Sequence, residues 1–230
     1  MSAANELPSW REVLLRGHRT FPKVPWAAAS RWNAKPLTLL ILIFGLSLFG
    51  VGEALLYLSR LGNSPWVVLS EGLALRTDLD LGLVNGLVSV AVLALWLPLR
   101  ERPGLGTILN IILISWVLEL MVTHLPMVST PVVQYTYAIG GLLLVGLASA
   151  LYITTNLGPG PRDGLMTALH HRTGIRVSRV RLSLETVVFI SGWLLGGRAG
   201  IGTLIFALFI GRAIALWLGV LARLVHPHVQ

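Results

Sequence analysis

Six apolar blocks, each close to twenty residues long, limit the folds that this sequence can adopt. They lie at about 37–59, 81–99, 105–123, 131–155, 182–197 and 200–222. An α-helix of about twenty residues crosses the roughly 30 Å hydrocarbon core of a bilayer. Only 12% of the 230 residues are charged, against the ~25% usual in soluble domains. The sequence therefore predicts an all-α, polytopic membrane protein with about six transmembrane helices, surrounded by the lipid bilayer.

The sequence overlays on itself, without a gap, when it is shifted by 96 residues. The informative matches are of glycine, proline, arginine and threonine: Gly62 with Gly158, Pro65 with Pro161, Arg76 with Arg172, Gly106 with Gly202, and Thr107 with Thr203. Each unit holds three of the six apolar blocks, and an odd number of spans turns the second unit upside down in the membrane. We therefore expect two inverted three-helix repeats, as in many secondary transporters.

Each unit also contains a helical segment that is too short to cross the bilayer, at residues 65–77 and 161–173. Both begin with proline, which is favoured in the first turn of a helix. Thirteen helical residues rise only about 20 Å. A full crossing would make the repeats parallel, and this short rise argues against it. We expect a half-helix in each unit, and the sequence leaves open whether it is re-entrant or interfacial.

The basic residues predict the domain organisation and the orientation. The predicted parts are a basic N-terminal arm (1–36), a first membrane repeat (37–126), a second membrane repeat (131–223) and a cytoplasmic tail (224–230). With the arm inside, fourteen Lys and Arg residues lie in cytoplasmic segments and three lie outside. This asymmetry predicts cytoplasmic N- and C-termini. The arm either lies free in the cytoplasm or rests on the membrane surface, anchored by Trp10, Trp26 and Trp32.

The most distinctive local sequence is Pro161-Arg162-Asp163-Gly164, at the start of the second half-helix. A helix that begins here offers free backbone N–H groups to an anion, and the guanidinium of Arg162 adds a charged donor. Asp163 lies in the first turn, at the positive end of the helix. We predict that these four residues contact a substrate. The alternative is a tight turn that an Arg–Asp pair holds in place.

The equivalent place in the first unit is Pro65-Trp66, which keeps the turn and lacks the charged pair. We include Pro65 and Trp66 in the predicted substrate site, because transporters of this kind bind between their repeats. For Trp66 the alternative is an anchor at the membrane interface.

Four charged residues fall within the apolar blocks: Glu53, Glu119, Glu185 and Arg212. A charge at membrane depth is costly and marks a candidate functional position. Arg212 cannot lose its charge, so we expect it to pair with Glu185, the carboxylate nearest in predicted depth. Glu53 and Glu119 lie at similar predicted depth, and the sequence leaves open whether they share a proton or reach headgroup water.

Several classes of function lack their signatures in this sequence. Cysteine is absent, which excludes thiol catalysis and Cys-ligated metal sites. No catalytic triad order, metal-ligand cluster or phosphate-binding loop is present, and no nucleic-acid-binding signature accompanies the net charge of +8. We therefore expect no enzyme activity, no metal, no cofactor and no nucleic-acid partner.

The run from Leu157 to Met166, together with Gly200-Ile201-Gly202-Thr203, resembles the bacterial YczE/YyaS-type integral membrane proteins. These proteins look like relatives of the YitT group, and the likeness covers most of residues 37–222. The resemblance implies a place in the bacterial cytoplasmic (inner) membrane. It implies no substrate, because the family is largely without an assigned biochemical function.

The leading hypothesis is a small secondary transporter or permease-like protein with a site between the two repeats. Its partner would be a small anionic or zwitterionic solute. The alternative is a non-transporting scaffold or regulator that assists a partner protein through its basic arm. The oligomeric state stays open, with a homodimer as one alternative.

Overall fold

The computed structural model describes residues 22 and 24–225. Within these residues all regular secondary structure is helical, so the predicted all-α class is confirmed. The helices are α2 (Pro36–Leu58), α3 (Pro65–Thr77), α4 (Leu81–Ala94), α5 (Trp96–Leu99), α6 (Leu105–His124), α7 (Pro131–Thr154), α8 (Pro161–Thr173), α9 (Val177–Leu194) and α10 (Ile201–Val225).

Five segments of the described chain are long and apolar enough to cross a membrane, namely α2, α4 with α5, α6, α7 and α10. The remaining predicted span, 182–197, differs from the structure, because α9 begins earlier, at Val177. The earlier start brings Arg179 and Arg181 into the helix. These two and Glu185 give α9 three charged residues in 18, so its composition alone does not mark it as a span.

The predicted block 81–99 is interrupted near its end. Helix α4 ends at Ala94, and the short α5 follows from Trp96. Pro98 accounts for the break, because proline lacks an N–H and its ring clashes with the carbonyl four residues earlier, here that of Ala94.

The two half-helices begin and end at the residues that the sequence predicts. Pro65 and Pro161 occupy their first turns. Each ends at a residue with a left-handed backbone, Asp78 with φ 55° and Gly174 with φ 70°. Three residues separate each half-helix from the next long helix, α4 or α9, so each half-helix finishes at the end of the bundle where that long helix starts.

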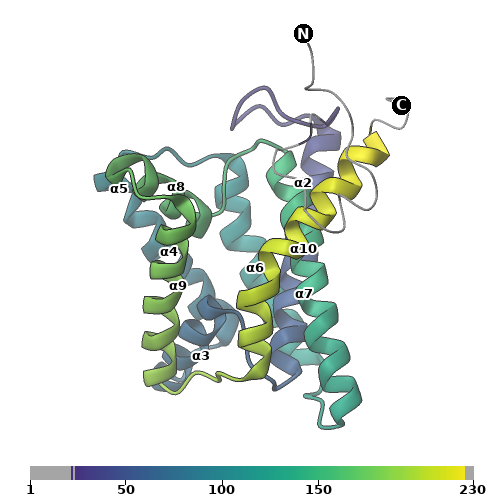
Figure 1. Ribbon diagram of the computed structural model, residues 1–230, viewed down its shortest axis with the longest axis vertical. Helices are drawn as coiled ribbons and strands as arrows, with labels where there is room; N and C mark the ends of the chain where they lie inside the picture. The colour runs from purple at the N-terminus through teal and green to yellow at the C-terminus, as the bar shows by residue number, and fades with distance from the viewer. Residues whose placement is uncertain (1–21, 23, 226–230) are drawn as a thin grey trace.

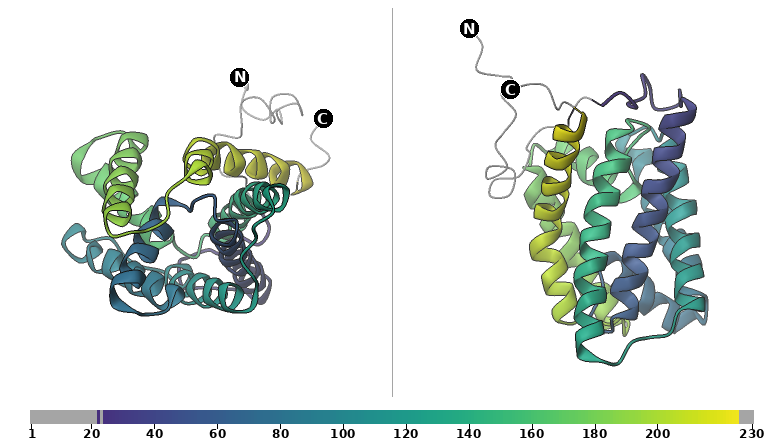
Figure 2. Two further views of the ribbon diagram at one scale, coloured as in Figure 1. Left: turned by 90° about the horizontal axis from the view of Figure 1, so that it is seen from below. Right: turned by 90° about the vertical axis from the view of Figure 1, so that its right-hand side faces the viewer.

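The long helices alternate in direction (Figure 1). Helix α2 begins at the end of the bundle where α10 finishes, and α3 and α8 lie at opposite ends. Figure 2 shows α2 beside α7. Their backbones approach closely at glycines, since a Cβ built on Gly141 would lie 2.7 Å from the carbonyl oxygen of Gly52. Each helix of the first half runs opposite to its counterpart in the second half.

The loops that precede the half-helices are tied to the opposite half of the chain. The N–H of Gly202, in α10, donates to the carbonyl oxygen of Leu61 at 2.8 Å. The N–H of Gly106, in α6, donates to Leu157 at the same distance. These residues exchange places under the shift of 96 positions. The start of each half-helix is therefore fixed by the last helix of the other half.

Part of the basic arm is described, and it packs on the protein. The N–H of Ala28 donates to the carbonyl oxygen of Thr155 at 2.8 Å, and Arg31 pairs with Glu101 at 3.2 Å. Trp32 is exposed. Residues 1–21, with Trp10, and residues 226–230 of the tail lie outside the described residues, so the predictions made for them stay predictions.

Candidate functional site

Both half-helices begin at one cavity of about 90 Å³ inside the bundle. The residues that cap their N-termini, Ser64 for α3 and Gly160 for α8, belong to its lining. A space of this size accommodates several water molecules or a small solute. Polar and charged side chains thus gather at the middle of an otherwise apolar bundle.

Most residues that line the cavity come in pairs that lie 96 positions apart in the sequence. The pairs are Phe49 and Val145, Glu53 and Ser149, Ser64 and Gly160, Trp66 and Arg162, Asn85 and Arg181, Ser89 and Glu185, Asn110 and Phe206, and Ile114 and Ile210. The cavity is therefore built from corresponding places in the two halves. The two side chains of a pair differ in chemistry, so the two halves contribute different charges to the cavity.

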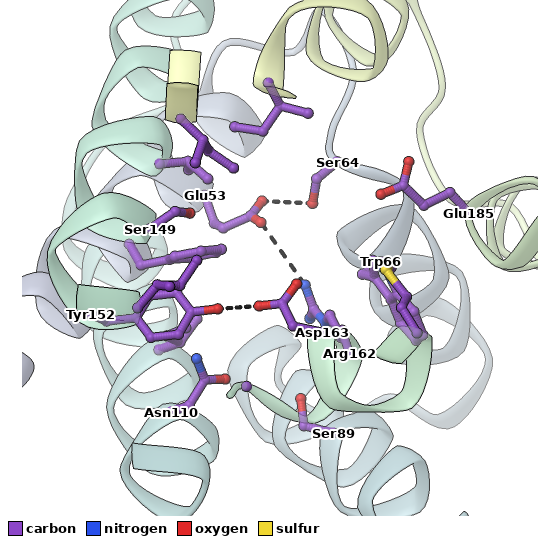
Figure 3. Close-up of a pocket in the computed structure, with 18 of the residues that line it drawn as sticks. Glu53, Ser64, Trp66, Ser89, Asn110, Ser149, Tyr152, Arg162, Asp163 and Glu185 are labelled. Carbon is purple, nitrogen blue, oxygen red and sulfur yellow. Dashed lines mark hydrogen bonds and ion pairs between the residues drawn. The ribbon is translucent and has the colours of Figure 1, made fainter. Parts of the chain in front are cut away.

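Arg162 is the central cation of the cavity, and it is held from three sides. Its Nη2 donates to Oδ1 of Asn85 at 2.7 Å, and its guanidinium carbon lies 5.1 Å from the centre of the Trp66 ring. Its Nη1 lies 4.0 Å from Oε1 of Glu53 (Figure 3). This separation is longer than a hydrogen bond. Asn85 and Trp66 thus orient the guanidinium, and Glu53 does not form a direct hydrogen bond with it.

Glu53 is the most deeply buried carboxylate of the cavity, with a side chain only 2% exposed. It belongs to α2, and its Oε2 accepts a hydrogen bond from Oγ of Ser64 at 2.7 Å. A buried charge needs partners because its removal from water is costly. Ser64 and Arg162 supply them, so Glu53 links α2 to the beginnings of both half-helices.

Asp163 lies at the accessible side of the cavity. It is exposed, and its Oδ2 accepts a hydrogen bond from the hydroxyl of Tyr152, a residue of α7 that is 2% exposed (Figure 3). Exposure falls from Asp163 to Arg162, whose side chain is 17% exposed, and then to Glu53. Asp163 is therefore the most accessible of these three side chains.

The first turn of α8 is held by the first half of the chain. The indole Nε1 of Trp96 donates to the carbonyl oxygen of Pro161 at 3.0 Å. Oγ1 of Thr107 donates to the carbonyl oxygen of Pro159 at 2.7 Å. Both bonds satisfy backbone carbonyls directly before or within the first turn, so the position of Arg162 does not depend on α8 alone.

Several of the predicted site residues meet at this cavity. Trp66, Arg162, Asp163, Glu53 and Glu185 all line it. Pro65, Pro161 and Gly164 are buried in the first turns of the half-helices. The interface-anchor alternative for Trp66 is wrong, because Trp66 is 5% exposed and packs in a core cluster with Val84 and Trp96.

Other predicted charges lie elsewhere. The expected pairing of Arg212 with Glu185 is wrong, since Glu185 pairs with Arg181 at 2.8 Å. Arg212 is exposed on α10, with its guanidinium 5.6 Å from the ring of Phe209. Glu119 accepts from the N–H of Gly82 at 2.7 Å. Glu119 therefore has a partner other than Glu53. This contact argues against the alternative in which Glu53 and Glu119 share a proton.

A second buried carboxylate, Glu71 on α3, was missed by the sequence analysis. Its Oε2 accepts from Nδ2 of Asn63 and from the backbone N–H of Arg198, both at 2.8 Å. Its Oε1 lies 3.8 Å from Nη2 of Arg198. These contacts fasten α3 to the loop between α9 and α10.

Asn85 and Tyr152 were also missed as members of the site. Asn85 joins two helices through a hydrogen bond to Ser115 at 3.1 Å, and it also positions Arg162. Tyr152 follows Ser149 by three residues on α7, and Ser149 is the counterpart of Glu53 under the repeat. A search for polar residues one helical turn from the position equivalent to Glu53 would have identified Tyr152.

Comparisons with known proteins place this chain among bacterial relatives. A family model described as a family of unknown function, DUF6198, matches residues 37–218. A protein of Haemophilus influenzae, described as uncharacterized, is 44% identical over 211 residues, which cover 92% of this chain and 96% of that protein. No solved structure matches the chain with significance.

Two further relatives come from Bacillus subtilis. The uncharacterized membrane protein YczE is 32% identical over 184 residues, which cover 79% of this chain and 82% of YczE. The uncharacterized protein YyaS is 25% identical over 183 residues, which cover 78% of this chain and 91% of YyaS. The resemblance to YczE and YyaS is therefore confirmed, and this membrane protein belongs to the DUF6198 family of unknown function.

Proposed function

We propose that the protein is a small secondary transporter whose substrate, a small solute with an anionic group, binds to Arg162 in the central cavity. The chain would cross the bacterial cytoplasmic membrane six times, with α9 as the sixth span. Its N- and C-termini would lie in the cytoplasm. Its two halves would be inverted repeats, each with a re-entrant half-helix.

The observation that carries this proposal is the meeting of two half-helix N-termini at one polar cavity. A helix N-terminus carries about half a positive elementary charge and free N–H groups. Interrupted helices that direct such ends at a site near the middle of the membrane are typical of secondary transporters. The guanidinium of Arg162 adds a charge at the same place.

The paired contacts of the two halves support the inverted arrangement. Leu61 and Gly202 are bonded in the same way as Leu157 and Gly106, and the counterparts run in opposite directions. In transporters built from inverted repeats, one half rocks against the other around a site at their interface. The cavity has that location, because its lining comes in pairs from both halves.

The basic residues support the proposed orientation. With α2 beginning and α10 ending at one end of the bundle, that end carries most of the arginines between the helices. Arg100 and Arg102 follow α5, and Arg172 and Arg176 lie at the end of α8 and directly before α9. Positive residues accumulate on the cytoplasmic side of membrane proteins.

The test is uptake by the purified full-length protein in liposomes. Acetate, lactate, phosphate and glycine, each radiolabelled, are offered under an inward gradient. At least one should enter faster than in empty liposomes, and Arg162→Gln should reduce that rate at least tenfold. Arg102→Gln, a change in the loop before α6, is the matched control. If all four solutes enter at the rate of empty liposomes, or Arg162→Gln matches the wild type, the proposal is wrong.

A further inference from the structure

We propose that the cavity takes up one proton with each anion it binds, and that Glu53 is the group that accepts the proton. This inference rests on the proposed function, because it concerns how the same cavity is loaded. It adds a coupling ion, the proton, and the residue that carries it.

The first step is a competition for Arg162. Its Nη2 donates to Asn85 at 2.7 Å, and one face of the guanidinium lies over the ring of Trp66. The remaining approach is the Nη1 side, where Oε1 of Glu53 lies 4.0 Å away. A carboxylate or other oxyanion binds a guanidinium at shorter distances, with charge-assisted hydrogen bonds. An entering anion would therefore take over the side of Arg162 that Glu53 faces.

The second step concerns the carboxylate that loses its partner. Glu53 has a side chain 2% exposed and keeps one hydrogen bond, from Ser64 at 2.7 Å. A buried carboxylate without its cationic partner is strongly destabilised, and such groups respond by becoming neutral. One proton from the water that reaches the cavity forms one O–H bond on Glu53. It returns to water when the anion leaves, and no other bond changes.

The charges around Glu53 favour the same outcome. The other charged and titratable side chains that line the same cavity are Arg162 and Asp163 of α8, Arg181 and Glu185 of α9, and Tyr152 of α7. With Glu53, the lining contains three carboxylates and two guanidinium groups. The two half-helix N-termini offset the excess with about half a positive charge each. The summed charge of the lining is thus close to neutral, and an anion that entered alone would make it negative.

The other two carboxylates keep their own partners. Asp163 accepts from Tyr152, and Glu185 pairs with Arg181 at 2.8 Å. Both are more exposed than Glu53. Glu53 is therefore the carboxylate whose surroundings change when Arg162 is occupied.

The experiment measures proton uptake on binding by the purified full-length protein in detergent. Acetate and lactate are titrated at pH 7.5 in weak buffer, with phenol red as the pH indicator and calorimetry for binding; phosphate, which itself exchanges protons at this pH, is titrated by calorimetry alone. The wild type should take up about one proton for each anion bound. Glu53→Gln should bind the anion and take up at most a tenth as many protons. Glu101→Gln, an equal change in a carboxylate paired with Arg31 on the surface, should behave as the wild type does.

The outcomes separate the two proposals. Binding of an anion by the wild type without proton uptake overturns the coupling and leaves the transporter proposal intact. Equal proton uptake by Glu53→Gln overturns the assignment to Glu53. Glycine, a zwitterion, is titrated in the same way, and its binding in place of the anions without proton uptake also overturns the coupling. A wild type that binds none of the four solutes removes the proposed function and the coupling together.

Discussion

The indole Nε1 of Trp96 donates to the carbonyl oxygen of Pro161 at 3.0 Å, so the first half of the chain holds the first residue of α8. The contact is close, because a Cβ built on Gly164 would lie 2.0 Å from Cζ2 of Trp96. Gly164 therefore allows the indole ring to lie against the first turn of α8. The ring fixes the end of the helix from which Arg162 enters the cavity.

Gly164→Ala is expected to lower stability by about 1–3 kcal/mol, since the added methyl group overlaps a buried ring and forces the two elements apart. Thermal unfolding in detergent should show a clear fall in Tm. The control is Gly211→Ala on α10, where a Cβ meets nothing within 4 Å. There the higher helix propensity of alanine should add about 0.5–1 kcal/mol. Equal changes in Tm for the two variants would contradict the role given to Gly164.

Arg162→Gln is expected to destabilise the protein by about 3–5 kcal/mol at neutral pH, because it leaves the carboxylate of Glu53 buried without its cation. The double variant Glu53→Gln with Arg162→Gln should recover most of this loss. Denaturation in detergent should also show that Arg162→Gln alone recovers as the pH falls, because Glu53 without its cation binds a proton more tightly in the folded protein than in the unfolded chain. Additive effects of the two substitutions would show that these side chains do not interact.

Glu71→Ala is expected to loosen the loop between α9 and α10. It removes the acceptor for Asn63 and for the backbone N–H of Arg198, and an unsatisfied buried donor costs about 1–3 kcal/mol. Hydrogen exchange of residues 195–200 should become faster than in the wild type. Glu101→Ala, which breaks a more exposed pair, should leave that loop unchanged. Unaltered exchange in Glu71→Ala would mean that α3 does not hold the loop.

The absence of native cysteine permits a direct test of the inverted orientation. Leu79, between α3 and α4, is 43% exposed, and Ile175, between α8 and α9, is 47% exposed. A membrane-impermeant maleimide should label Leu79→Cys in intact cells. Ile175→Cys should react only after the membrane is permeabilised. Labelling of both from the same side would exclude inverted repeats.

Much of the fold could be predicted from the sequence, because the start of a helix depends on residues that are close together in the chain. Proline at the first turn placed the beginnings of α3 and α8 at Pro65 and Pro161. The start of α9 was missed because its first turns carry arginines, which a hydropathy pattern reads as loop. The break before α5 was missed because Pro98 lies within a run that is otherwise apolar.

The candidate site was predicted in part. Its charged members could be found because a charge stands out in an apolar sequence, as Glu53 and Arg162 do. Their partners could not, because depth in the membrane does not specify which face of a helix a side chain occupies. Arg212 illustrates the limit, since its position on the exposed face of α10 depends on the rotation of that helix in the bundle. Glu71 was overlooked because it lies in a half-helix outside the long apolar blocks.

The stacking of Arg162 on Trp66 has a consequence for how such a chain could have arisen. The two residues stand 96 positions apart and meet at 5.1 Å. In a symmetric pair of identical short chains, one residue type would have to fill both places, and two guanidinium groups at that separation would repel each other. An aromatic ring opposite a cation requires two copies that are free to differ in sequence, whether as halves of one chain or as separate chains. A short chain that paired only with a copy of itself could therefore not have formed this contact.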